Sequence, residues 1–297
     1  MNIIGRRKIW FALSLLTIVL GIISMIYRTA TVGTPLNLGI DFTGGNLISI
    51  DFKKPVSVQE LRAVLKDYGL ENSVIQRTGT NEVLIRTRVL DDREQAQVVK
   101  SFGEKIGPYN KDKLRLDKVG PVMGKELTRN ALLALVIASV LITIYITFRF
   151  EFLFGIAAII ALLHDAFVTV GIFSIFWWEI DSSFVAAILT IIGYSINDTI
   201  VIFDRIRENL HKRKKDQDLE TLVNDSVLQV MTRSINTVLM VVVVLLALLF
   251  FGGATVRNFT LALLIGTISG AYSSIFNASP LWVEFRNLAR KRKIARA

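Results

Sequence analysis

Two acidic residues lie inside the long apolar segments of this 297-residue chain, and one arginine lies at the edge of another such segment. The acidic residues are Asp165 and Asp198, and Arg233 lies two residues before the run that begins at Ile235. A charge at the centre of a membrane helix costs about 2.5–3.5 kcal/mol on insertion scales, so such residues usually face a bundle interior and serve its function. Burial disfavours an ionised carboxylate, whereas a nearby guanidinium favours it. Asp198 and Arg233 are therefore the predicted proton-relay pair, because a movable Arg233 would let Asp198 bind and release a proton.

The sequence leaves other interpretations of these charges open. Asp198 can be one half of a structural ion pair, and Arg233 can be an anchor at the cytoplasmic edge of the membrane. Asp165 and His164 can join the relay, or they can hold helices together by packing. Because successive residues of an α-helix point about 100° apart, we do not expect His164 and Asp165 to face the same groove.

Small and polar residues accompany the predicted pair at helical spacing. Four of them are possible relay or packing residues: Tyr194, Asn197, Asn236 and Thr237. The last apolar run carries a stripe suited to close helix packing: Gly266, Gly270, Ser273, Ser274 and Asn277. The chain has no cysteine, which excludes thiolate chemistry and cysteine-based metal sites. We expect no enzymatic activity, no metal and no organic cofactor.

Six apolar runs are long enough to cross a membrane. Hydrophobic residues make up 52% of the chain and the mean hydropathy is +0.49, more than a soluble core needs. About 20 residues at 1.5 Å each cross a hydrocarbon core of about 30 Å. The sequence predicts spanning helices over residues 9–27, 131–148, 152–178, 184–203, 235–251 and 259–276. We interpret the first as an uncleaved anchor rather than a signal peptide.

Lysine and arginine are unevenly divided between the two sides of the predicted membrane. Seventeen lie in the N-terminus, at Arg149, in segment 204–233 and in the tail, whereas the opposite short loops hold Arg257 alone. Basic residues concentrate on the cytoplasmic side, so we expect both termini there and residues 28–128 outside. The net charge of +10 is then mainly topological, and we expect no nucleic-acid partner, although the tail could touch anionic lipid or ribosomal RNA.

Residues 28–128 have the composition of a soluble domain. Ser57 and Glu60 form the pattern of a capping box at the start of a helix. Asp92 is predicted to open a second helix, with Ala96 on its inward face. The predicted elements are a strand at 46–52, a helix at 58–69, strands at 73–77 and 82–89 around a turn at 78–81, a helix at 92–106 and a strand at 113–119. This order predicts a ferredoxin-like α+β domain without a catalytic site.

The predicted fold is an α-helical membrane protein of six spans with a ferredoxin-like extracytoplasmic domain between the first two. Its expected parts are the N-terminus and first span (1–27), the outer domain (28–128), a five-helix bundle (129–280) with a cytoplasmic loop (204–233), and a basic cytoplasmic tail (281–297).

Six motifs follow one another along the chain: LGIDFTGG (38–45), VGPVMG (119–124), ALLHD (161–165), IIGYSINDTIVIFDRIREN (191–209), RSINT (233–237) and YSSIF (272–276). Their order and spacing resemble the SecF family, the smaller subunits of the bacterial SecD–SecF complex that accompanies the Sec protein-export channel. The resemblance covers nearly the full length, and the block 191–209 is its most specific part. We interpret five residues of the first two motifs as hinges or turns of the outer domain: Asp41, Gly44, Gly45, Gly120 and Pro121.

The resemblance implies one half of a transporter of the RND superfamily, with SecD as a separate chain supplying the other half. It implies a multi-pass protein of the bacterial cytoplasmic membrane that uses the proton-motive force beside the SecY–SecE–SecG channel to promote preprotein translocation. In the family, the acidic residue of the fourth span and the arginine of the fifth are the proton-linked pair, and they match Asp198 and Arg233. Val238 and Ala271 stand where the family usually has serine and threonine. This chain therefore has fewer hydroxyl groups along the polar faces of its spans than the resemblance implies.

Two other functions remain possible from the sequence. An RND-type exporter of small molecules or lipids would need an apolar outer pocket, for which the small domain offers no obvious candidate. A scaffold that only stabilises another membrane complex would tolerate neutralisation of Asp198.

Overall fold

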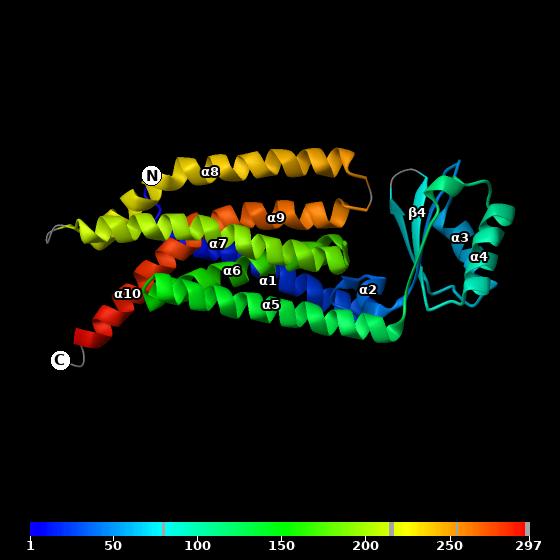
Figure 1. Cartoon of the computed structure of the whole chain (residues 1–297), viewed down its shortest axis with the longest axis horizontal. Coiled ribbons are helices and arrows are strands. Elements are labelled where there is room, and N and C mark those ends of the chain that lie inside the picture. The colour runs from blue at the N-terminus through cyan, green and yellow to red at the C-terminus, as the bar shows by residue number, and fades with distance from the viewer. Residues whose placement is uncertain (79–80, 214–216, 254, 295–297) are drawn as a thin grey trace. The chain divides into compact units, whose positions relative to one another are not determined.

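Among the described residues of the computed structural model, six helices are long and apolar enough to cross a membrane, which confirms the six predicted spans (Figure 1). The structure describes the chain apart from residues 79–80, 214–216, 254 and 295–297. The chain divides into a helical unit, Met1–Asn37 with Leu133–Ala297, and a smaller unit, Leu38–Leu132. The smaller unit starts later than the predicted outer domain, because the first helix continues to Val32.

Five of the six spanning helices extend beyond the apolar runs that predicted them, whereas the third ends two residues before the end of its run. Their bounds are α1 (Arg7–Val32), α5 (Pro121–Arg149), α6 (Phe152–Phe176), α7 (Ser182–His211), α8 (Leu219–Phe251), α9 (Arg257–Ser273) and α10 (Ser279–Ile294). A π-helical turn, η2 (Ser274–Ala278), joins α9 to α10. Two short strands, β1 (Asn37–Leu38) and β6 (Glu179–Ile180), lie between helices.

Segment 204–233, predicted as a loop, is helical at both of its ends. α7 continues to His211, and α8 begins at Leu219. Asp218 caps α8, since its carboxylate accepts a hydrogen bond from the backbone N–H of Thr221 at 2.9 Å. The predicted basic tail is likewise helical as far as Ile294. Polar residues therefore continue these helices past the apolar stretch.

Two glycines let α1 and α6 cross at close range. A Cβ added to Gly21 would lie 2.8 Å from the Cα atom of Gly171, and one added to Gly171 would lie 3.0 Å from the Cα atom of Gly21. A Cβ atom at 2.8 Å from backbone would force the helices to shift, and one at 3.0 Å would be tighter than most real Cβ contacts. The backbones of α1 and α6 are thus in direct contact, as small residues permit in membrane bundles.

The stripe of small residues predicted for the last span packs against α7. A Cβ at Gly270 would lie 3.0 Å from the Cβ atom of Ser195, and one at Gly266 would collide with the side chain of Ile191. This close approach brings the hydroxyl groups of α7 and α9 next to each other.

The smaller unit has the ferredoxin-like order that the sequence predicts. Its elements are α2 (Ile40–Thr43), β2 (Gly45–Asp51), α3 (Val58–Lys66), β3 (Val74–Thr78), β4 (Glu82–Thr87), α4 (Asp92–Lys105), η1 (Lys111–Lys113) and β5 (Arg115–Val119). The strands form one antiparallel sheet in the order β3-β4-β2-β5. β3 and β4 form the predicted hairpin, although residues 79–80 of its turn lie outside the described residues.

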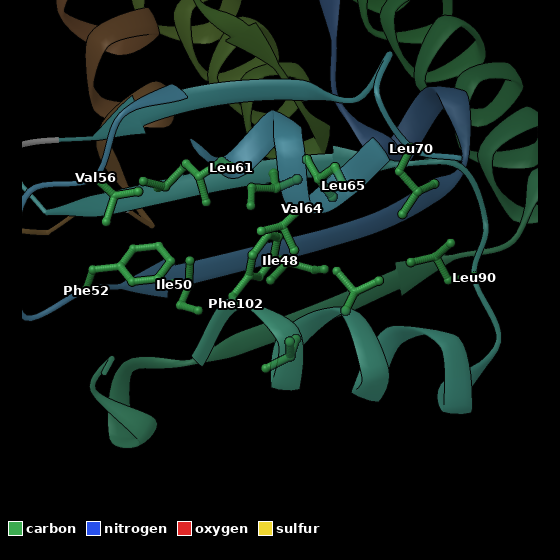
Figure 2. Packing of buried hydrophobic residues seen from close by; sticks show 14 residues of the cluster. Ile48, Ile50, Phe52, Val56, Leu61, Val64, Leu65, Leu70, Leu90 and Phe102 are labelled. Atoms are coloured by element: carbon green, nitrogen blue, oxygen red, sulfur yellow. The ribbon is translucent and has the colours of Figure 1, made fainter. Parts of the chain in front are cut away.

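One hydrophobic core holds the sheet and both helices of this unit together. Figure 2 shows side chains of β2, such as Ile48 and Ile50, meeting Leu61 of α3 and Phe102 of α4. The ring of Phe102 stands edge-on to that of Phe52, with centroids 6.5 Å apart. Burial of such side chains is worth about 1.5–3 kcal/mol each, so the core is the main source of this unit's stability.

The starts of both helices of the smaller unit agree with the sequence prediction. Ser57 Oγ accepts from the N–H of Glu60 and Glu60 Oε2 accepts from the N–H of Ser57, which confirms the capping box. α4 begins at Asp92, as predicted, and Asp91 caps it by accepting a hydrogen bond from the N–H of Glu94. Ala96, predicted to point inward, is exposed, because the buried face of α4 is centred on Val98.

We expect Gly21→Val to lower the melting temperature of the purified chain in mild detergent. The added side chain must push α1 away from α6, and forced repacking of this kind typically costs about 1–3 kcal/mol. Gly193→Val in α7 is the matched control, because a Cβ there meets no atom within 4 Å. Equal melting temperatures for the two variants would contradict the close crossing.

The capping box makes the first turn of α3 sensitive to acid. The backbone N–H of Ser57 bonds the Glu60 carboxylate and lowers the pKa of Glu60. The cap therefore stabilises α3 above the ordinary carboxyl range and is lost as the pH falls through the lowered pKa. We expect amide-exchange protection of the first turn, corrected for intrinsic rates, to fall below about pH 4. Glu60→Gln should lower this protection at neutral pH and abolish the acid step.

Candidate functional site

Asp165 is buried among polar side chains, and we call this group of residues the Asp165 cage: Asp165, His164, Ser195, Ser269 and Ser273. Its carboxylate oxygens accept hydrogen bonds from Ser195 Oγ at 2.7 Å, Ser269 Oγ at 2.8 Å and Ser273 Oγ at 2.8 Å. Asp165 is only 1% exposed. The donors come from α7 and α9, so one carboxylate of α6 ties three helices together.

His164 also reaches this carboxylate, contrary to the expectation that neighbouring residues face different grooves. Its Nδ1 atom lies 3.0 Å from Asp165 Oδ1. The 100° separation of the two Cβ atoms is bridged because imidazole and carboxylate turn toward each other across the helix surface. His164 Nε2 is buried without a hydrogen-bond partner among the described residues, and the ring lies beside that of Tyr272 with centroids 5.9 Å apart.

Asp198 has a different environment. Its Oδ1 atom accepts a hydrogen bond from Ser234 Oγ of α8 at 2.6 Å. Its Oδ2 atom is buried and has no partner among the described residues. Asp198 is 9% exposed and Ser234 is 1% exposed, so this contact lies between α7 and α8. One oxygen of Asp198 is therefore free to carry a proton.

Arg233 does not form an ion pair with Asp198 within the described part of the chain, where Ser234 is the residue that contacts the carboxylate. Arg233 is exposed, and so are Asn197, Asn236 and Thr237. Tyr194 is half-buried, and its side chain interacts with that of Thr237. Only Tyr194 and Thr237 of the predicted neighbours thus join α7 to α8 near Asp198.

A seam of hydroxyl groups connects the surroundings of the two carboxylates. Thr199, the residue after Asp198, lies with its Oγ1 atom 2.7 Å from Ser274 Oγ. Ser274 Oγ in turn donates to the carbonyl oxygen of Ser195, a member of the Asp165 cage. Ser274 begins the π-helical turn η2, and such turns are frequent at functional sites.

The sequence reasoning missed most of the serine donors. Ser195, Ser234 and Ser269 were not singled out, and Ser273 was noted only as a small residue. A usable signal was present: Ser269 and Ser273 lie one helical turn apart, so both can face the same acidic side chain. Ser14 of α1 was also missed, and it exchanges hydrogen bonds with the side chain of Asn277.

The predicted hinge residues lie in the smaller unit. Gly44 and Gly45 have φ values of 71° and 131°, which other residues rarely adopt, so they make the turn between α2 and β2. Asp41 belongs to α2, and Pro121 begins α5 directly after Gly120. The described residues include no group of three or more His, Cys, Asp or Glu side chains able to hold a metal ion.

Two family models match the chain. Residues 98–288 match the model described as "Protein export membrane protein SecD/SecF, C-terminal", and residues 29–56 match the SecD/SecF GG motif. The Gly44–Gly45 turn lies within the second match. The first match contains both buried carboxylates and all the serines that contact them.

Curated relatives and a solved structure agree with these matches. SecF of Sebaldella termitidis is 42% identical over 95% of this chain and 90% of its own length, and SecF of Acidaminococcus fermentans is 42% identical over 98% and 99%. The crystal structure of SecDF from Thermus thermophilus superposes with a TM-score of 0.87 at 35% identity. It aligns with 97% of this chain, which spans only 39% of that longer protein. The chain therefore belongs to the SecF family of protein-export membrane proteins.

Proposed function

We propose that this chain is a subunit of the Sec protein translocase that works with a separate SecD chain and uses the proton-motive force to promote preprotein movement across the bacterial cytoplasmic membrane. The observation that carries the proposal is the half-satisfied carboxylate of Asp198, whose Oδ2 atom is buried without a partner. Protons are the driving ions, and the SecY–SecE–SecG channel is the site of action.

The proposed cycle uses α8 as the moving element. In the proton-free state, the ionised Asp198 needs positive charge, and Arg233 supplies it. When a proton binds Oδ2, the neutral acid needs no cation and keeps the hydroxyl of Ser234. Arg233 and Ser234 are neighbours on α8 and point about 100° apart, so a rotation or a small slide of α8 exchanges one for the other.

The energy available is sufficient for such an exchange. Moving one charge through 100 mV supplies about 2.3 kcal/mol. Since 1.4 kcal/mol corresponds to a tenfold change in an equilibrium constant, one proton biases a two-state helix arrangement by about fifty-fold. We infer that this bias moves the outer unit, which engages the translocating preprotein.

The proposed partners and orientation have separate support. SecF relatives of nearly equal length are separate chains, whereas the SecDF protein of Bacillus subtilis, 42% identical over 98% of this chain, is a longer polypeptide of which this chain covers 39%. The bias of seventeen basic residues against one favours cytoplasmic termini and an extracytoplasmic position for residues 28–128.

We expect Asp198→Asn and Arg233→Met to insert normally and to reduce preprotein export at least tenfold in inverted membrane vesicles that contain SecD, after ATP is exhausted and with the proton-motive force maintained. Asp204→Asn is the matched control, because Asp204 lies further along α7 and forms a half-exposed ion pair with Arg149 at 3.5 Å. Normal export by both relay variants would refute the proton-driven mechanism.

The two carboxylates should differ in their contribution to stability. In Asp165→Asn, the amide nitrogen cannot accept the serine hydrogen bonds that one carboxylate oxygen accepts, and each buried unsatisfied group costs about 1–3 kcal/mol. Asp198→Asn disturbs only the contact with Ser234. We expect a clearly lower melting temperature in detergent for Asp165→Asn than for Asp198→Asn. A stable Asp165→Asn variant that fails to export would instead place Asp165 in the relay.

A further inference from the structure

A cavity of about 980 Å³ opens among the ends of four helices of the helical unit. Its lining comes from the start of α6 and the residue before it, the end of α7, the start of α8 and the last part of α10. Figure 1 shows the start of α8 and the end of α10 at the same end of this unit as both termini. The cavity therefore lies where the spanning helices reach the polar boundary of a membrane.

Arginines dominate the charge of this cavity. Four of them line it: Arg207, Arg213, Arg286 and Arg290. The first two donate to neutral groups, since Arg207 bonds the carbonyl oxygen of Arg149 and Arg213 bonds that of Gln217. Neither contact neutralises a guanidinium.

Arg286 is the residue that most needs an anion. Its Nη1 atom is buried and has no hydrogen-bond partner among the described residues. The guanidinium lies over the ring of Trp282 at 4.9 Å, which fixes its plane. Arg286 as a whole is half-buried, but a buried donor atom without a partner is costly. A planar guanidinium held in place suits two parallel bonds to phosphate oxygens.

The acidic residues of the lining do not balance these arginines. Glu220 pairs with Arg7 of α1 at 3.0 Å. Asp218 caps α8 by accepting from the N–H and hydroxyl of Thr221, and it keeps its negative charge. Asp218 and the exposed Glu151 therefore face four arginines. The cavity is thus a net positive site.

We propose that this cavity binds the phosphate headgroup of an anionic phospholipid. The arginines supply the charge and the bidentate geometry that a phosphodiester requires. Apolar side chains of the same lining, Phe154, Leu210 and Leu219, offer contacts for the glycerol and the first methylene groups. Basic pockets between membrane helices on the cytoplasmic side are suited to such headgroups. The bound lipid would tie α7, α8 and α10 together at one end of the bundle.

The test measures lipid binding by the full chain in mild detergent. Native mass spectrometry with added cardiolipin, phosphatidylglycerol or phosphatidylcholine should show retention of the two anionic lipids and little of the third. Arg286→Gln should weaken retention about tenfold or more, because it removes charge-assisted hydrogen bonds. Arg286→Lys keeps the positive charge but loses the planar guanidinium that can make two parallel hydrogen bonds. Its lipid retention should lie between that of Arg286→Gln and that of the unchanged chain.

Two further variants keep the test decisive. Arg290→Gln changes an exposed side chain, so its expected loss of lipid does not depend on the packing of Trp282. Arg205→Gln is the matched control, because Arg205 pairs with Glu208 on α7 and lies outside the lining. It should change retention by less than about twofold.

Three results would overturn the proposal. The Arg286 and Arg290 variants could retain anionic lipid as well as the unchanged chain does. The unchanged chain could also retain phosphatidylcholine as well as it retains the anionic lipids. Inorganic phosphate could also bind tightly and displace the lipids, which would assign the cavity to a soluble phosphate compound instead.

Discussion

The helical unit depends on one constraint: a carboxylate placed inside an apolar bundle must find donors there. Asp165 meets this constraint with three serine hydroxyls from two other helices. Those serines must come within about 3 Å of the carboxylate, which is possible only where helices approach closely. Gly266 and Gly270 allow that approach by leaving room for α7. The small residues and the acidic residue are thus parts of the same packing solution.

The two buried carboxylates differ in how many hydrogen-bond donors they have. Asp165 accepts hydrogen bonds from three serines and also contacts His164. An exchange of partners would break several of these contacts. Asp198 has one serine donor and one free oxygen, and it faces a helix, α8, that is mostly exposed in this unit. A group that must switch partners is expected to be incompletely satisfied in any one state, because a fully satisfied group resists exchange. The proposed relay therefore lies at the less tightly packed edge of the bundle.

The sequence predicted the elements better than the contacts between them. The apolar runs, the Ser57–Glu60 capping box and the order of strands and helices along the smaller unit each follow from local patterns, and the structure confirms them. α4 begins at Asp92 as predicted, and the residue before it, Asp91, supplies the capping carboxylate that the sequence analysis did not single out. The contact of Gly21 with Gly171 and the serine donors of Asp165 were missed, since they depend on the rotation of whole helices about their axes. For the same reason, the choice of Ser234 over Arg233 beside Asp198 could not be predicted.

The π-helical turn η2 has a geometric consequence for the last span. A wide turn holds one residue more than an α-helical turn, which advances the phase of everything after it by about 100°. Before the turn, hydroxyl groups of α9 face Asp165 of α6. After it, the ring of Trp282 stacks on Phe154, also of α6, with centroids 4.4 Å apart. A single inserted residue thus lets the last span contact α6 in two ways. Serine hydroxyls bind Asp165 before the turn, and the ring of Trp282 stacks on that of Phe154 after it.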